Sequence, residues 1–172
     1  MSTLRVDTIA NTAGTTNNRV LQVLQTVKTN VFSTASVSWV DWTGMSATIT
    51  PQSTSSKVLV TLTSGVSNDT NNSFQYVKLV RGVTDIALGD TVGSVTRCWI
   101  DGAFGTLSSF GLAQKPLVGS FLDSPATISA TTYKLQVIRT ANGTAYFGRS
   151  ANIIDANRSS IPSVLTLMEI AG

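Results

Sequence analysis

The sequence contains few of the side chains on which enzymes rely for acid–base or nucleophilic chemistry. It has no histidine, which excludes a Ser-His-Asp triad, a Cys-His pair and any metal site with imidazole ligands. The single cysteine, Cys98, lies beside Trp99 and Ile100. It can form neither an internal disulfide nor a multi-cysteine zinc site. We interpret it as a small buried hydrophobic residue.

The nine acidic residues are scattered along the chain and suggest neither a catalytic pair nor a cation loop. The paired acids of a glycoside hydrolase could be assembled only by the fold. Asp69 with Asn71 and Asn72, and Asp85 with Asp90, offer oxygen atoms, but neither group has calcium-loop spacing. Solvation of loops and Asx turns are the favoured uses of these residues. The sequence therefore predicts no catalytic residue, no metal ligand and no cofactor site.

Two polar segments, residues 65–73 and 151–162, are long enough to form loops at the tip of a β domain. Loops carry binding residues more often than strands do, because strand residues are committed to ladders and to the core. The candidate contact residues are Asp69, Asn71 and Asn72 in the first segment and Asn152, Asp155 and Arg158 in the second. Amide and carboxylate groups suit sugar hydroxyls, and the Arg158 guanidinium can make a forked contact to an acidic sugar.

The three tryptophans offer another route to sugar binding, because the apolar face of a sugar stacks on an aromatic plane. Trp39 and Trp42 lie three residues apart in a predicted strand. They should therefore point to opposite faces and cannot share one site. We expect the tryptophans, including Trp99, to pack in the core or in an interface.

The charge distribution argues against nucleic acid and membranes as partners. Twelve Lys and Arg residues against nine acidic residues give a formal net charge of +3, and the basic residues are spread evenly along the chain. A nucleic-acid surface would gather them in a stripe with stacking aromatic residues. No run of eighteen uncharged apolar residues occurs, and residues 1–7 hold no apolar signal segment. We expect a soluble protein that is made in a cytoplasm.

Composition and periodicity indicate an all-β chain. Apolar residues make up 42% of the sequence and charged residues only 12%, about half of the usual quarter. Apolar and polar residues alternate over short runs, and no segment shows a sustained helical period. A chain of 172 residues suits one domain. We expect an antiparallel β-sandwich of jelly-roll type over residues 20–172.

The expected strands follow one another at short intervals. They are Val20–Thr29, Ser36–Trp42, Met45–Thr50, Lys57–Ser64, Phe74–Arg81, Ile86–Leu88, Val95–Asp101, Thr132–Thr140, Thr144–Ser150 and Ser163–Ile170. Residues 102–120 are not assigned, apart from a short strand that begins at Lys115. Asn142-Gly143 favours a type I′ turn, so the strands on either side of it are expected to form a hairpin. Asp123 and Ser124 are expected in a turn, bonded to their own backbone.

Residues 1–19 differ from the rest of the chain and are expected to form an anchoring arm and linker. Leu4, Val6 and Ile9 are the only large aliphatic side chains in residues 2–19, so an arm that docks on a neighbour must anchor through them. A frayed terminus is the alternative.

Two predicted strands, Val20–Thr29 and Ser163–Ile170, carry apolar residues on both faces. A monomeric two-layer sandwich buries only one face of each strand, so the second face predicts self-association. The low charge content agrees with this prediction, because interface cores are depleted in charge.

Several stretches resemble proteins of tailed bacteriophages. Residues 1–14, MSTLRVDTIANTAG, are similar to the start of many tail-fibre and other virion proteins of phages from aquatic hosts. Similar stretches in the body are residues 20–26 (VLQVLQT), 49–60 (ITPQSTSSKVLV), 79–82 (LVRG), 121–125 (FLDSP) and 131–135 (TTYKL). The similarity spans nearly the full chain and its motifs are structural. It implies a homotrimeric β-sandwich at the surface of a virion.

The expected function is that of a non-enzymatic virion structural protein. We expect a homotrimer of the tail, of short-fibre or receptor-binding type, joined to another phage protein by residues 1–19 and able to contact a glycan of the host surface. A capsid decoration or head-fibre protein is one alternative, and a free lectin-like carbohydrate-binding module is another. The expected location is the virion, after synthesis in the host cytoplasm.

Overall fold

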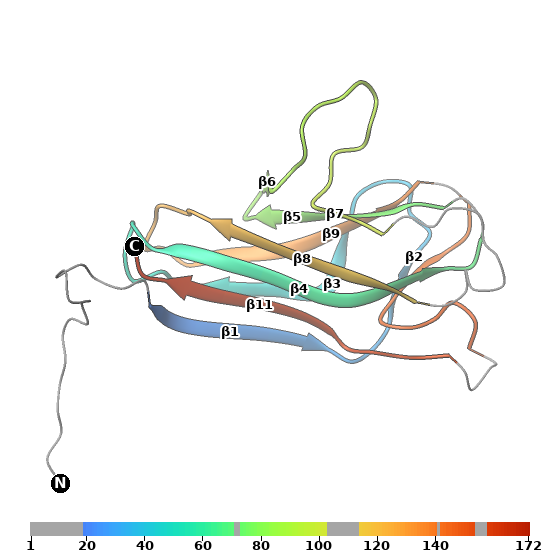
Figure 1. Ribbon diagram of the computed structural model, residues 1–172, viewed down its shortest axis with the longest axis horizontal. Coiled ribbons are helices and arrows are strands. Elements are labelled where there is room, and N and C mark those ends of the chain that lie inside the picture. Colours follow the sequence, from blue (N-terminus) through green and yellow to red (C-terminus); the bar gives the residue numbers. More distant parts are fainter. Residues whose placement is uncertain (1–18, 71–72, 103–113, 141, 154–157) are drawn as a thin grey trace, which may run out of the picture.

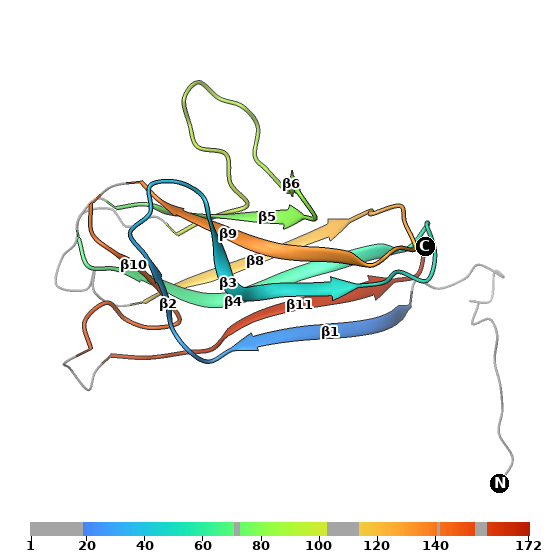
Figure 2. The same cartoon turned by 180° about the vertical axis from the view of Figure 1, so that it is seen from behind.

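A computed structural model describes residues 19–70, 73–102, 114–140, 142–153 and 158–172. These residues form eleven β-strands in two antiparallel sheets that pack face to face. Figures 1 and 2 show the two layers from opposite sides. The expected all-β sandwich is confirmed. No helix in the described ranges is long and apolar enough to cross a membrane.

Six strands form the first sheet and five form the second. The six-stranded sheet contains β1 (Val20–Lys28), β2 (Phe32–Thr34), β4 (Lys57–Asn68), β8 (Lys115–Asp123), β10 (Ala145–Phe147) and β11 (Ser163–Ile170). The five-stranded sheet contains β3 (Val40–Ile49), β5 (Gln75–Arg81), β6 (Thr84–Ile86), β7 (Ile100–Asp101) and β9 (Thr131–Arg139).

The long strands alternate between the sheets along the chain. Strands β1, β4, β8 and β11 lie in the first sheet in the order β1-β11-β4-β8, and β3, β5 and β9 lie in the second in the order β3-β9-β5. Strands β10 and β11 pair with successive parts of the same edge of β4, whose other edge pairs with β8. This connectivity, in which the chain repeatedly crosses the sandwich, is that of a jelly roll.

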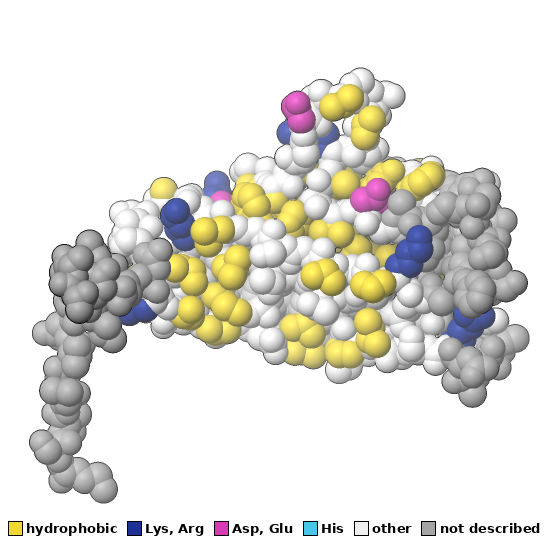
Figure 3. Space-filling model, viewed as in Figure 1, with side chains coloured by type: hydrophobic (Ala, Val, Ile, Leu, Met, Phe, Trp, Pro, Cys, Tyr) yellow, Lys and Arg dark blue, Asp and Glu magenta, His cyan; other side chains and the backbone are white. Residues whose placement is uncertain are grey.

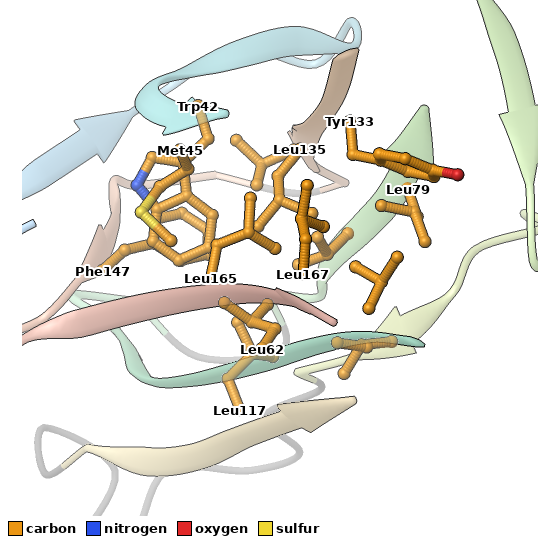
Figure 4. Packing of buried hydrophobic residues seen from close by; sticks show 14 of the residues in the cluster. Trp42, Met45, Leu62, Leu79, Leu117, Tyr133, Leu135, Phe147, Leu165 and Leu167 are labelled. Carbon is orange, nitrogen blue, oxygen red and sulfur yellow. The ribbon is translucent and has the colours of Figure 1, made fainter. Parts of the chain in front are cut away.

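The core lies between the sheets, as the alternation of apolar residues predicts. Leu62, Leu165 and Leu167 of the first sheet point toward Leu79 and Leu135 of the second (Figure 4), and all five are fully buried. At one end the rings of Trp42 and Phe147 pack with centroids 4.4 Å apart.

Polar side chains join the sheets at their margins. At the β1–β3 margin, Gln22 Nε2 donates to the carbonyl oxygen of Thr50 at 2.8 Å, and Thr26 Oγ1 donates to that of Ser46 at 2.8 Å. Buried Glu169 lies nearby and accepts from Gln22 Nε2 at 2.6 Å. The bond from Gln22 gives the buried Glu169 carboxylate a partner, whereas the two bonds to backbone carbonyl groups join the sheets at an exposed margin.

The predicted hairpin at Asn142-Gly143 is wrong. The strand before this turn, β9, pairs with β3 and β5 in the second sheet, whereas the strand after it, β10, pairs with β2 and β4 in the first. Gly143 does adopt a positive φ of 89°. The turn residues were therefore recognised, but the chain uses them to cross between sheets, as the jelly-roll order requires.

Other strand predictions need correction. The two strands expected on either side of Gly44 form the single strand β3, with Gly44 at a φ of 83° and a break in register between Asp41 and Ser46. This irregularity turns both Trp42 and Met45 inward. Strand β4 continues to Asn68 because its last residues pair with β10. Of the strand expected over 95–101, only β7 is present, and the short β2 was not predicted.

Candidate recognition and assembly surfaces

The two ends of the sandwich differ in what they carry. The start of β1 and the C-terminus lie at one end, where the amide of Ala171 donates to the carbonyl oxygen of Arg19 at 2.9 Å. The ends of β4 and β10 lie at the opposite end (Figures 1 and 2). Asp69 and Asn152 follow these two strands in the chain, and the bridge between Arg149 and Ser160 brings the segment of Arg158 beside them. The expected arm residues Leu4, Val6 and Ile9 lie outside the described residues; Arg19, the first described residue, lies at the first of these ends.

Asp69 is exposed and holds the neighbouring crossing segment. Its Oδ1 accepts from the amide of Thr144 at 2.7 Å, and its Oδ2 accepts from the Tyr146 hydroxyl at 3.2 Å. Asp69 therefore has a structural role in the segment that the sequence predicts to bind a ligand. Asn71 and Asn72 lie outside the described residues.

Arg158 and Asn152 line a cavity of about 210 Å³ that also includes Arg149. The Arg149 guanidinium lies 3.9 Å from the centroid of the Tyr146 ring and donates from Nη1 to two backbone carbonyl oxygens. The Nε of Arg158 is buried without a hydrogen-bond partner. Two guanidinium groups at one cavity suit an anionic group such as a carboxylate. Asp155 lies outside the described residues.

Arg149 was not among the predicted contact residues. It lies two residues after the end of β10, and the bridge between Arg149 and Ser160 brings it beside the segment that carries Arg158. The local sequence does not predict that Arg149 and Arg158 lie close together. Their positions depend on the pairing of both β10 and β11 with β4, which is a nonlocal property.

A larger hollow of about 600 Å³ lies between β8 and the segment that precedes β7, with Cys98, Trp99 and Phe121 among its lining residues. Cys98 is half-buried, and this burial raises the pKa of its thiol, with a smaller contribution from Asp101. A thiol with a raised pKa is a poor nucleophile at neutral pH. Burial thus disfavours the thiolate form of Cys98 on which nucleophilic cysteine chemistry depends.

The tryptophans behave as the strand geometry predicts. Trp42 is buried in the core, whereas the half-buried Trp39 lies directly before β3, with Lys78 Nζ of the outer face 4.5 Å from its ring centroid. They do not form a joint platform for a sugar. Within the described ranges, no group of three or more Asp, Glu, Cys or His residues is placed to hold a metal ion.

Comparisons with known proteins add little to this geometry. No family model matches the chain, and none of the curated proteins matches it. Among solved structures, that of infectious bursal disease virus, Gx strain, aligns with 99% of this chain and 43% of its own chain, with 11% sequence identity and a TM-score of 0.43. The chain thus spans less than half the length of that protein, and a likeness at this level transfers no function to it.

Proposed function

We propose that this chain is a non-enzymatic structural protein of a bacteriophage virion, a homotrimer of the tail that is attached through residues 1–19. The resemblance of residues 1–14 and of several body segments to phage virion proteins supports the class of protein. The observation that carries the proposal is that Arg19 and the C-terminus lie at one end of the sandwich and the described candidate contact residues at the other.

This placement suits a subunit that is anchored at one end and exposed at the other. The amide of Ala171 bonds the carbonyl group of Arg19, so an arm that precedes Arg19 leaves the domain beside the C-terminus. The cavity between Arg149 and Arg158 then faces away from the point of attachment. Such a cavity favours the tail within the proposal, because a receptor-binding subunit needs exposed polar groups at its outer end.

The attachment is tested by deleting residues 1–16. The sandwich should keep its thermal melting temperature, because the first strand begins only at Val20. The truncated protein should be missing from purified particles when these are examined by mass spectrometry, whereas the full chain is present. Assembly of the truncated protein at the normal level would show that the arm does not attach it.

The location on the tail is tested separately by Arg158→Ala in infectious particles. This change should reduce the rate of adsorption to host cells on a tail subunit. Asp90→Ala is a matched control, since Asp90 is an exposed charged residue outside the candidate contact segments. Normal adsorption of the Arg158→Ala particles would favour the capsid alternative.

A further inference from the structure

The outer face of the six-stranded sheet carries three cross-strand rows of residues that alternate in character. Each row runs through β1, β11, β4 and β8. The first row is Val23, Met168, Leu59 and Leu122, the second is Gln25, Thr166, Thr61 and Ser120, and the third is Val27, Val164, Thr63 and Val118. The first row is entirely apolar. The second row consists of residues with hydroxyl or amide groups, and the third row consists of three valines and one threonine.

No residue of these rows is charged, yet several large apolar side chains in them are exposed. The exposed fractions are 57% for Val23, 52% for Val27, 62% for Val118 and 48% for Leu122. Figure 3 shows hydrophobic side chains across this face, with Lys and Arg toward its two ends. Exposed apolar residues that gather on one face mark an interaction surface.

The outer face of the other sheet shows what a solvated face of this protein looks like. There Lys134 Nζ donates to Asp41 at 3.0 Å, and Lys78 Nζ donates to Asp85 at 2.6 Å. Gln136 Nε2 also donates to Asp41 at 2.8 Å. Charged pairs are therefore present on the outer face of the five-stranded sheet and absent from the three rows of the six-stranded sheet. The low charge content of the whole chain does not by itself explain why these rows lack charged residues.

We propose that three copies of this chain pack around an axis parallel to the strands, with this face of each copy turned inward. Each row would then meet the same row of its neighbours at one height along the axis. Apolar rows would form apolar layers, and the middle row would form a layer of hydroxyl and amide groups that can bond one another. A second copy matches because its face is equally free of charge, whereas a charged partner would leave charges unpaired.

The uncharged rows supply part of the area that this arrangement needs. At a strand spacing of about 4.8 Å and about 6.8 Å between successive residues on one face, twelve positions cover roughly 400 Å² of flat sheet. This is about half of the roughly 800 Å² that one partner contributes to a stable interface. The adjoining row holds Val20 and Ile170, which pair with each other, and the exposed Lys57, which pairs with Ile170 and marks one end of the uncharged rows.

A threefold axis along the strands also brings all three N-terminal ends to the same end of the assembly. A face-to-face dimer whose twofold axis lies parallel to the sheets and perpendicular to the strands would point the two N-termini in opposite directions. The inference therefore deepens the proposed function and rests on it for the trimeric state, but the interface can be tested on the isolated protein.

The test is the mass of the full chain in solution, measured by sedimentation equilibrium at micromolar concentration. The wild-type protein should have three times the monomer mass of 18.1 kDa. The double variant Val23→Glu/Val118→Glu should dissociate, with its association weakened by at least about 100-fold, because like charges brought together at an interface cost several kcal/mol. Both valines are exposed, so the monomer should keep its fold, which near-ultraviolet circular dichroism checks.

Val83→Glu is the matched control, since Val83 is 97% exposed in the turn between β5 and β6 of the other sheet. This variant should remain a trimer. A second measurement places a cysteine in the middle row: Thr61→Cys in a Cys98→Ser background should form disulfide-linked dimers on oxidation, whereas Val83→Cys in the same background should not.

A monomeric wild-type protein, a double variant that stays trimeric or a dimer in place of the trimer would overturn the inference. Dissociation of Val83→Glu to the same extent as the double variant would do so as well. A trimer that uses this face but is missing from purified particles would instead refute the proposed virion role and leave the interface intact.

Discussion

Replacing Asp123 by alanine should destabilise the protein more than replacing Asp41 or Asp85, the carboxylates of two other ion pairs in the described residues. Asp123 ends β8 in the first sheet and is only 6% exposed. Arg81 Nη1 of β5 donates to both of its carboxylate oxygens at 2.9 Å, and the Tyr133 hydroxyl of β9 donates to Oδ2 at 2.6 Å. The carboxylate therefore joins the two sheets, and the expectation of a local turn bonded to its own backbone is replaced by this contact.

The size of the effect follows from what the substitution leaves behind. The Tyr133 hydroxyl is completely buried, and a buried donor without an acceptor costs about 1–3 kcal/mol. The Arg81 side chain is 30% exposed, so water can replace part of its lost contact. We expect Asp123→Ala to lower the free energy of unfolding by about 3 kcal/mol. For a chain of this length that corresponds to a fall in melting temperature of roughly 6–12 °C.

A double-mutant cycle with Tyr133→Phe tests the cause. In the Asp123→Ala background, Tyr133→Phe should restore about 1–2 kcal/mol of the free energy of unfolding, because it removes the buried hydroxyl donor that has lost its acceptor. Urea unfolding at one protein concentration measures these values and avoids the concentration dependence of an oligomer. Asp85→Ala, which breaks the more exposed pair with Lys78, is the control and should cost less than about 1 kcal/mol. A cost below about 1 kcal/mol for Asp123→Ala, or no coupling with Tyr133→Phe, would refute the reasoning.

Two further predictions concern Glu169 and Asp69. Burial by itself raises the pKa of Glu169, but hydrogen bonds from the Gln22 side chain and from the amide of Gln52, at 2.6 and 2.7 Å, outweigh it, so the pKa lies below its usual value. Its contribution to stability is therefore complete above the unfolded pKa and is lost as the pH falls through the folded pKa. Between about pH 5 and about pH 3, the melting temperature of the wild type should fall more than that of Glu169→Gln, and equal slopes would contradict this. Asp69→Ala should lower the free energy of unfolding by about 1–2 kcal/mol through the loss of the bonds to Thr144 and Tyr146. Asp69→Asn, which keeps an acceptor, should cost less, and a neutral alanine variant would leave Asp69 without a structural role.

The sequence by itself determined the class of fold and the direction in which most side chains point. Burial alternates over residues Lys57–Ser64 and Thr131–Arg139, as local sequence predicts, because the side-chain period of a strand is two. The composition likewise excluded histidine chemistry without any knowledge of the structure. These conclusions need only local information.

Only the tertiary structure decided which strands are neighbours. The Asn142-Gly143 turn has the residues of a hairpin, yet the strands that flank it belong to different sheets. In the same way, the bonds of Asp123 to residues 42 and 10 positions away join segments that no local pattern connects. Turn residues fix backbone angles over two positions, whereas strand pairing is selected by the packing of the whole core.

The proposed interface shows the same division. Sequence alternation predicted that Val20–Thr29 and Ser163–Ile170 have apolar residues on both faces. The pairing of β1, β11, β4 and β8 then aligned residues from four separate parts of the chain into apolar and hydroxyl rows. Periodicity assigns a side chain to a face, but the register between strands is a nonlocal property, so the tertiary structure alone decides which side chains share a row.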